Sequence, residues 1–297
     1  AILDDDILAG ELSPPAGVDG RVHWVEVFET PLVPRVGRFG WKSQMASVLS
    51  FSADAALNEM GLTNRFLVEE NAPNGDLDLL AICDTVADPE DGPDGEGYHF
   101  IDRVTDFQRF LAPPPQTPRS GMSGEALFVA VGCAACHTPS FTTGVVAEDV
   151  LSAKVLKPYS DFLLHDMGLL GDGIAQGDAG ETEMRTPPLW GVRLRDPLLH
   201  DGRVAAGTFT TRMLAVIGWH GTTGSEAAGS VAAFDALNPA DQDRLIAFLD
   251  SLGRVEFDHE GDSDVDLTDW QTSLACLVDP GSAAYSPDDP CAISDFD

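Results

Sequence analysis

Basic residues are scarce in this chain of 297 residues: 17 Lys and Arg stand against 49 Asp and Glu, giving a formal net charge of −32. A phosphate backbone or an anionic membrane surface would repel such a chain, so nucleic acid is set aside as a partner. Long apolar runs are absent too, and none approaches the about 20 residues that a membrane-spanning helix needs. The first residues, AILDDD, lack the basic and apolar regions of a signal peptide. The 43% of hydrophobic residues nevertheless suffice for a buried core.

Cysteine is sparse as well, and the five residues are Cys83, Cys133, Cys136, Cys276 and Cys291. Cys133, Cys136 and His137 form a C-x-x-C-H motif. Two thiols at this spacing can form thioethers with the vinyl groups of one haem, and the following histidine is then the proximal iron ligand. A thioredoxin-like redox pair would need a preceding strand, and half a zinc site would need a second cysteine pair nearby. The motif therefore predicts one covalently bound haem c in this chain.

Covalent haem of this type is attached outside the cytoplasmic membrane, so the sequence predicts a periplasmic or extracellular protein. Disulfides persist in the same compartment. Cys276 and Cys291 lie fifteen residues apart in a loop-rich segment, and we expect them to form a disulfide, with two free thiols as the alternative. Cys83 is left over, either free or paired with a residue outside this chain.

The composition divides the chain into three expected parts, 1–119, 120–254 and 255–297. A proline-rich stretch at 113–118 ends the first part. The third part holds twelve acidic residues and no Lys or Arg, which marks it as a separate acidic tail. Within the first part, we expect the acidic stretch 71–97 to form a surface loop.

Helices are expected at 43–60, from 123 into the haem motif, at 210–219 and from 239 to 252. The last of these has Asn238 as N-cap, proline at the first position and an apolar face. Two helices that bracket a haem motif are the plan of cytochrome c, and the Gly-, Pro- and Asp-rich segment 138–209 should be mostly loops. The expected fold is therefore mainly α: a cytochrome c-like haem domain with long loops, the remnant of a preceding cytochrome c-like domain, and a small EF-hand or dockerin-like tail.

Short motifs spread over residues 1–254 resemble one known family. They are GRFGWK at 37–42, NEMG at 58–61, CAACH at 133–137, DFLLHDMG at 161–168, RTPPLWG at 185–191, HDGR at 200–203 and WHG at 219–221. With them the chain resembles the di-haem cytochrome c peroxidase and MauG superfamily, and within it a di-haem thiol oxidoreductase branch. Members carry two haems in two cytochrome c domains, and the first haem motif normally lies upstream of the segment that corresponds to Ala1. The resemblance implies that this chain is the C-terminal part of a di-haem protein, with a true single-haem derivative as the alternative.

The resemblance also implies the second iron ligand. In the related peroxidases the distal ligand stands at the end of the helix after the His-Asp-Gly motif, and that place here is occupied by His220, with Met213 as the chief alternative. His200, which precedes Asp-Gly, is expected to support the haem or its loop rather than to bind iron. His165 is either such a supporting residue or a hydrogen-bonded core histidine.

Four further residues have expected roles. Arg185 and Arg203 are candidates to pair with haem propionates, because a planar guanidinium fits a carboxylate; surface ion pairs are the alternative. Trp41 corresponds in the family to a tryptophan between the two haems that passes electrons, or else it is a core residue. Glu59 occupies the place of a glutamate that acts as acid and base at the upstream, peroxide-reacting haem.

The tail segment 258–269 has the spacing of an EF-hand or dockerin-type calcium loop. Its expected ligands are Asp258, Glu260, Asp262, Asp264, Asp266 and Asp269. Ser263 stands where glycine is usual, and Asp269 stands where a bidentate glutamate is usual, so weak binding is expected. A merely solvated acidic run is the alternative.

Three functions remain open at this point. The first is an extracytoplasmic electron-transfer protein with a six-coordinate, bis-histidine haem. The second is the electron-feeding part of a di-haem peroxidase or oxidase, in which case the protein is an oxidoreductase enzyme. The third is a haem-bearing structural or filament subunit. The expected partners are a redox protein or a second haem domain, further copies of the chain, or a cell surface bound through the tail.

Overall fold

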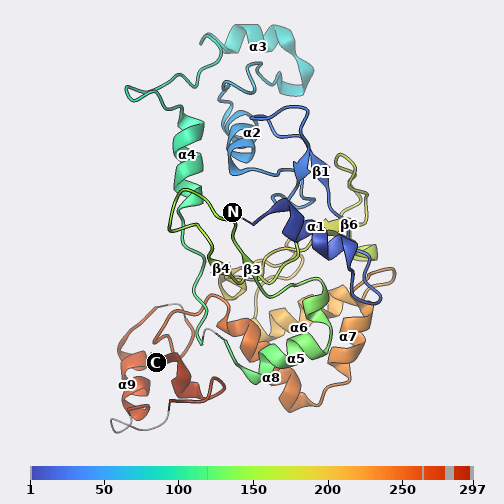
Figure 1. The fold of residues 1–297 in the computed structure, drawn as a ribbon, viewed down its shortest axis with the longest axis vertical. Helices are drawn as coiled ribbons and strands as arrows, with labels where there is room; N and C mark the ends of the chain where they lie inside the picture. Colours follow the sequence, from blue (N-terminus) through green and yellow to red (C-terminus); the bar gives the residue numbers. More distant parts are fainter. Residues whose placement is uncertain (1, 119, 263, 278–283, 295–297) are drawn as a thin grey trace. The chain divides into compact units, whose positions relative to one another are not determined.

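Helices make up most of the regular structure of the chain (Figure 1). The structure is a computed structural model, and it describes residues 2–118, 120–262, 264–277 and 284–294. Across these residues the strands form only short antiparallel pairs. The expectation of a mainly α fold is confirmed.

The chain divides into two units, and the first 21 residues belong with 113–297 rather than with 22–112. The first 21 residues join the later unit through a backbone pairing in which Arg21 and Leu164 exchange both hydrogen bonds, at 3.0 and 2.8 Å. The Arg21 guanidinium also forms a salt bridge with Glu183 at 2.5 Å. These bonds attach the N-terminal segment to the unit that carries the C-x-x-C-H motif, which we call the haem-motif unit.

Where the structure describes it, the haem-motif unit contains six α-helices and two strand pairs. The helices are α1 (Asp4–Leu12), α5 (Ser123–Ala130), α6 (Phe209–His220), α7 (Ala228–Asp235), α8 (Pro239–Ser251) and α9 (Leu267–Ala275). The strands are β3 (Phe141–Thr142) with β4 (Val155–Leu156), and β5 (Leu164–Asp166) with β6 (Glu183–Arg185). The 3-10 turns are η2 (Cys133–Ala135), η3 (Gly168–Leu170), η4 (Val192–Leu194) and η5 (Pro290–Ser294). Segment 138–209 is mostly loop, as its high content of Gly, Pro and Asp predicts.

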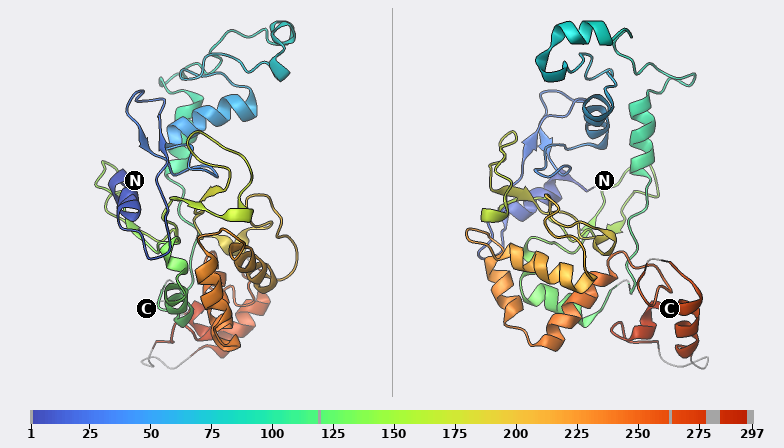
Figure 2. Two further views of the ribbon diagram at one scale, coloured as in Figure 1. Left: turned by 90° about the vertical axis from the view of Figure 1, so that its right-hand side faces the viewer. Right: turned by 180° about the vertical axis from the view of Figure 1, so that it is seen from behind.

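Helices α5 and α8 pack against each other at the centre of the haem-motif unit, with α6 beside α7 and α8 (Figures 1 and 2). Gly124 allows the close approach, because a Cβ at this position would lie 1.9 Å from the carbonyl oxygen of Arg244. One turn later Phe128 meets Phe248 edge-on, with ring centroids 5.4 Å apart. The α8 helix begins as its sequence predicts, because the Asn238 side chain accepts a hydrogen bond from the amide of Asp241.

The second unit, residues 22–112, has its own small core. Its elements are β1 (Trp24–Val25), β2 (Arg35–Val36), α2 (Val48–Met60), η1 (Pro73–Gly75), α3 (Leu77–Cys83) and α4 (Phe100–Arg109). Ala53 and Ala56 of α2 pack against Ile101 of α4. The α3 helix lies within the acidic stretch 71–97. The expectation that this whole stretch is a surface loop was therefore wrong.

The α2 helix begins later than its apolar pattern suggests. The expected start was residue 43, but Ser43 has a positive φ of 54° and Met45 pairs back onto Phe39. Ser47 is the N-cap, and its hydroxyl accepts a hydrogen bond from the amide of Ser50 at 3.0 Å. A tight turn through the GRFGWK segment therefore precedes the helix.

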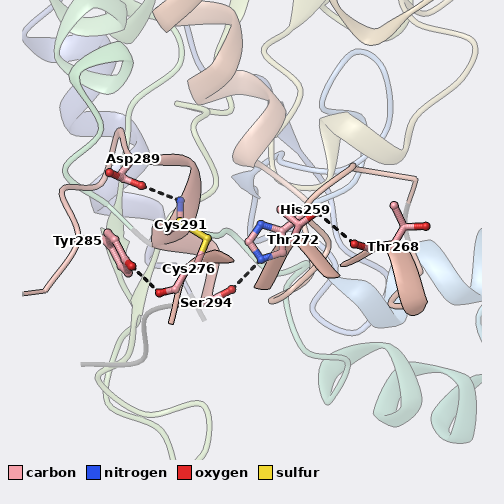
Figure 3. Close-up of a disulfide and its surroundings, with 8 residues drawn as sticks. All are labelled: His259, Thr268, Thr272, Cys276, Tyr285, Asp289, Cys291 and Ser294. Atoms are coloured by element: carbon pink, nitrogen blue, oxygen red, sulfur yellow. Dashed lines mark hydrogen bonds between the residues drawn. A yellow bond between two sulfur atoms is a disulfide. The ribbon is translucent and has the colours of Figure 1, made fainter. Parts of the chain in front are cut away.

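Within the acidic tail, a disulfide links Cys276, at the end of α9, to Cys291 in η5 (Figure 3). Tyr285 donates a hydrogen bond to the carbonyl oxygen of Cys276. His259 lies 2.8 Å from the Ser294 hydroxyl. The His259–Ser294 contact thus connects the start of the predicted calcium loop with η5, which contains Cys291. Ser263 lies outside the described residues.

Candidate haem site

The C-x-x-C-H segment directly follows α5. Gly132 supplies the turn with a φ of 91°, and η2 then carries Cys133 into position. Cys133 and Cys136 are half-buried thiols that form no disulfide with each other. Burial, and secondarily the charge of a Cys136 thiolate, raise the pKa of Cys133 to about 12. The two residues are thus adjacent thiols without a disulfide, the arrangement that thioether attachment of haem requires.

His137 has a defined tautomer. Its Nδ1 lies 2.9 Å from the backbone carbonyl oxygen of Tyr159, and because a carbonyl oxygen can only accept, Nδ1 carries the proton. The lone pair of Nε2 is consequently left for a metal. The Phe128 ring, 6.2 Å away between centroids, packs against the imidazole.

The loop that supplies Tyr159 is bound to the haem motif at two further points. The amide of Ser160 donates to the carbonyl oxygen of Thr138 at 3.0 Å, and the amide of Asp161 donates to that of Cys136 at 2.9 Å. Tyr159 itself is completely buried, and its hydroxyl donates to Glu125 at 2.8 Å. The orientation of His137 is therefore determined by segment 159–161.

His220 is the last residue of α6 and has the same tautomer as His137. Its Nδ1 donates to the carbonyl oxygen of Val216, one turn earlier, at 2.8 Å. Burial is the main cause that lowers the pKa of both histidines, to about 4 for His137. A charge on His220 would lower the pKa of His137 further, which places the two imidazoles within electrostatic reach of each other. Both side chains are thus neutral at pH 7 and can act as ligands through Nε2.

Met213, the alternative to His220, is buried in the core, as is Met184, and His165 is hydrogen-bonded to carboxylates. The Met213 side chain is only 3% exposed and belongs to the apolar core around α8. Met184 is buried within β6. Both ring nitrogens of His165 contact carboxylates, Asp161 at 2.9 Å and Glu226 at 2.8 Å. Among His137, His165 and His220, the two whose Nδ1 bonds a backbone carbonyl oxygen and leaves Nε2 for a metal are His137 and His220.

Two arginines of this unit lie close together. Burial lowers the pKa of Arg185 to about 10, with the charge of Arg195 as the second cause, and burial alone lowers the pKa of Arg195. Two neighbouring, partly desolvated guanidinium groups favour an anion between or beside them. The free thiols, the two imidazoles with free Nε2 atoms and this arginine pair together fit a haem c with anionic propionates.

Arg203 and His200 occupy the loop before α6. Arg203 forms a 2.5 Å salt bridge with Asp201, and its guanidinium lies 4.5 Å above the ring centre of Trp219. His200 is half-buried in the same loop. A propionate contact of Arg203 and a supporting role of His200 stay predictions.

Trp41 and Glu59 lie in the second unit. The Trp41 side chain is 53% exposed in the turn that precedes α2. Glu59 is exposed in the last turn of α2, and its charge contributes to raising the pKa of Asp54, after the larger effect of burial. Their roles beside a second haem stay predictions.

Only some of the predicted calcium ligands lie close to one another. The carboxylates of Glu260, Asp266 and Asp269 lie within 4.8 Å of one another. Asp269 also accepts hydrogen bonds from the amides of His259 at 2.7 Å and Asp266 at 2.8 Å. Asp258 instead accepts from the amide of Gly261 at 2.6 Å.

Mutual repulsion is visible in the pKa values of this segment. The neighbouring carboxylates contribute, after burial, to a raised pKa of Glu260, and the charge of Asp262 is the main cause that raises the pKa of Asp264. A cation would relieve this repulsion. Asp262 and Asp264 are exposed.

Sequence reasoning did not identify Glu226 or Arg195. Glu226 lies 61 residues after His165 in a loop with no recognisable motif. Arg195 follows the RTPPLWG motif by four residues. Only the folded chain brings the first beside His165 and the second beside Arg185.

Comparison with known proteins assigns the family. The family described as "Di-haem oxidoreductase, putative peroxidase" matches residues 1–252, which is most of the chain. The protein belongs to this family of di-haem oxidoreductases, and haem is accordingly its class of cofactor. No curated protein and no solved structure matches the chain. Among the described residues, no helix is both long and apolar enough to cross a membrane.

Proposed function

We propose that this chain is an extracytoplasmic c-type haem protein that transfers electrons through one six-coordinate haem. Cys133 and Cys136 form the thioethers, and His137 and His220 are the axial ligands. One observation carries the proposal: both imidazoles donate Nδ1–H to a backbone carbonyl oxygen, Tyr159 for one and Val216 for the other, so that both present Nε2.

The residues of this chain suit electron transfer better than substrate binding. Haem iron supplies one-electron chemistry when it is bound. With a protein ligand on each side, no axial position is open to peroxide. The hydrogen bonds to Tyr159 and Val216 fix both ring orientations, so the two oxidation states need little rearrangement of the protein. Arg185 and Arg195 hold the propionates in this proposal.

Spectroscopy of the purified, haem-loaded chain tests the ligation. A bis-histidine iron gives a low-spin ferric spectrum without the near-infrared charge-transfer band of a His–Met pair. That band, or a high-spin ferric spectrum that changes on addition of cyanide within seconds, contradicts the proposal. The pyridine haemochrome assay on the same sample gives the haem count, for which we expect one haem per chain.

A second function follows from the family description as a peroxidase. In that case this haem feeds electrons to a catalytic haem that lies upstream or on another chain, with Trp41 between the haems and Glu59 as acid and base. The exposure of Glu59 on α2 leaves its carboxylate accessible to such a group. Two haems per assembled unit, with peroxide turnover that is lost in Glu59→Gln, would favour this function over simple electron transfer.

The acidic tail is proposed to bind one calcium ion and to serve attachment or assembly. The gathering of Glu260, Asp266 and Asp269 and the mutual repulsion of the neighbouring acids support this proposal. The Cys276–Cys291 disulfide closes the segment that follows the loop. It also fits the oxidising compartment in which covalent haem is attached.

A further inference from the structure

His165 is a buried titratable group beside the haem motif. Its side chain is 2% exposed, yet both ring nitrogens make short polar contacts. Nε2 lies 2.9 Å from Oδ2 of Asp161, and Nδ1 lies 2.8 Å from Oε2 of Glu226. Neither carboxylate belongs to the proposed iron ligands, and the electron-transfer function does not otherwise account for them.

The hydrogen-bond pattern determines the charge of this group. An ionised carboxylate can only accept, so each ring nitrogen has to donate and the ring is an imidazolium. Although burial raises the pKa of Glu226, the hydrogen bonds from His165 and from two backbone amides outweigh it, and the net result is a lowered pKa. One positive and two negative charges therefore lie together with a net charge of −1. We call His165, Asp161 and Glu226 the charged triad.

The triad touches the haem-attachment segment. Nδ1 of His165 lies 3.7 Å from Sγ of Cys136, the atom that would form a thioether. Asp161 also donates its backbone amide to the carbonyl oxygen of Cys136 at 2.9 Å. The imidazolium is thus adjacent to the edge at which a haem would be bound.

The N-terminal segment 19–21 encloses the triad. The amide of Asp19 donates to Oε2 of Glu226 at 2.9 Å. Gly20 lies flat against the imidazole, since a Cβ at this position would be 2.3–2.9 Å from three ring atoms. Arg21 pairs with Leu164, the residue before His165. Any side chain larger than hydrogen at position 20 must displace the ring.

We propose that the charged triad sets the reduction potential of the haem on Cys136, and that segment 19–21 holds His165 in place as part of this device. The inference rests on the proposed haem attachment and adds positioning residues that do not touch the iron. A positive charge near the iron favours the reduced state, which carries one positive charge less, and a negative charge favours the oxidised state. Because the triad is buried, these charges are poorly screened by solvent.

The test compares the midpoint potentials of single variants of the haem-loaded chain. Glu226→Gln removes a negative charge and should raise the potential. His165→Gln removes the positive charge and leaves two carboxylates, so it should lower the potential. Asp243→Asn, an exposed position on α8, is the control for one lost negative charge and should leave the potential unchanged.

Opposite signs for the two triad variants are the expected result, because loosened packing alone would shift both potentials in one direction. Shifts of the same sign, or shifts no larger than that of the control, overturn the inference. If His165→Gln does not load haem, Gly20→Ala takes its place. We expect it to lower the potential by displacing the ring, whereas Gly229→Ala, whose added methyl group meets no atom within 4 Å, should not change it.

Different measurements test the proposed electron-transfer function and the proposed role of the charged triad. Haem content and the low-spin spectrum of the unmodified chain test the proposed function. The signs of the potential shifts test the triad, and they do so for any covalently held haem at Cys136, whatever its sixth ligand.

Discussion

A hydrogen bond of 2.9 Å joins Nδ1 of His137 to the carbonyl oxygen of Tyr159, 22 residues further along the chain. The contact links the haem motif to a segment that is expected from sequence to be loop. Tyr159 is in turn packed edge-on against Phe248 of α8, with centroids 5.3 Å apart. The position of the proximal histidine therefore depends on the α5–α8 core and not only on the motif itself.

Replacing His220 by alanine should remove the sixth ligand. We expect the low-spin ferric spectrum to become high-spin or to acquire an exogenous ligand, while covalent haem is retained, since the thioethers are independent of His220. His200→Ala is the matched control and should keep the low-spin spectrum. An unchanged spectrum in His220→Ala, together with a change in His200→Ala, assigns the ligand to the loop before α6 instead.

Enlarging Gly124 should destabilise the haem-motif unit. In Gly124→Ala the new methyl group would lie 1.9 Å from the Arg244 carbonyl oxygen, so α5 and α8 must separate. We expect a loss of about 1–3 kcal/mol in the free energy of unfolding. Urea unfolding of Gly124→Ala and of the control Gly229→Ala measures the difference, and equal stability of the two variants contradicts this packing.

Acid should abolish the contribution of Glu226 to stability. The ordinary pKa of a glutamate is 4.5, and in the folded chain the pKa of Glu226 is lower. The stabilising effect of Glu226 is therefore fully present above 4.5 and is lost as the pH falls through the lower pKa of the folded state. The stability difference between the unmodified chain and Glu226→Gln should therefore be smaller below about pH 4.5 than at about pH 6. Chemical denaturation at several pH values tests this. A difference that grows as the pH falls contradicts the direction of the pKa shift.

Calcium should bind weakly to the tail of the full chain. Asp269 is shorter than the usual glutamate, and its carboxylate already accepts hydrogen bonds from backbone amides. The dissociation constant for calcium should therefore lie in the range of about 10⁻⁴–10⁻³ M. Calorimetry should show heat at millimolar calcium that is lost in Glu260→Gln and retained in Asp243→Asn. If the heat is absent, or is the same in both variants, the tail is a solvated acidic segment.

The sequence predicts those elements whose signals are local. The N-cap at Asn238, the proline at 239 and the apolar face of α8 all lie within one helix, and the start of α5 and the position of α6 follow similarly. The α2 start was wrong because a turn at Ser43 overrides the apolar pattern. The α3 helix was missed because its sequence, LDLLAIC, is short and apolar at every position except Asp78, so it shows no helical alternation of apolar and polar residues.

In the haem site too, the residues with local sequence signals were predicted, whereas those that reach the site only through the tertiary fold were not. The C-x-x-C-H motif and its histidine need only neighbouring residues, and they can be predicted from spacing. The partner of His137 is a backbone carbonyl, which has no sequence signature. Glu226 and segment 19–21 reach His165 only through the tertiary fold, and a charge balance of this kind depends on contacts that no local pattern encodes.

The most direct test of the account is the intact mass of the purified chain after denaturation. Covalent attachment at Cys133 and Cys136 predicts a mass increase of one haem that survives acid–acetone extraction. The haem should be found on the peptide that contains both cysteines, and Cys133→Ala/Cys136→Ala should lack it. A chain without added mass, or haem that is extracted by acid acetone, contradicts the central claim.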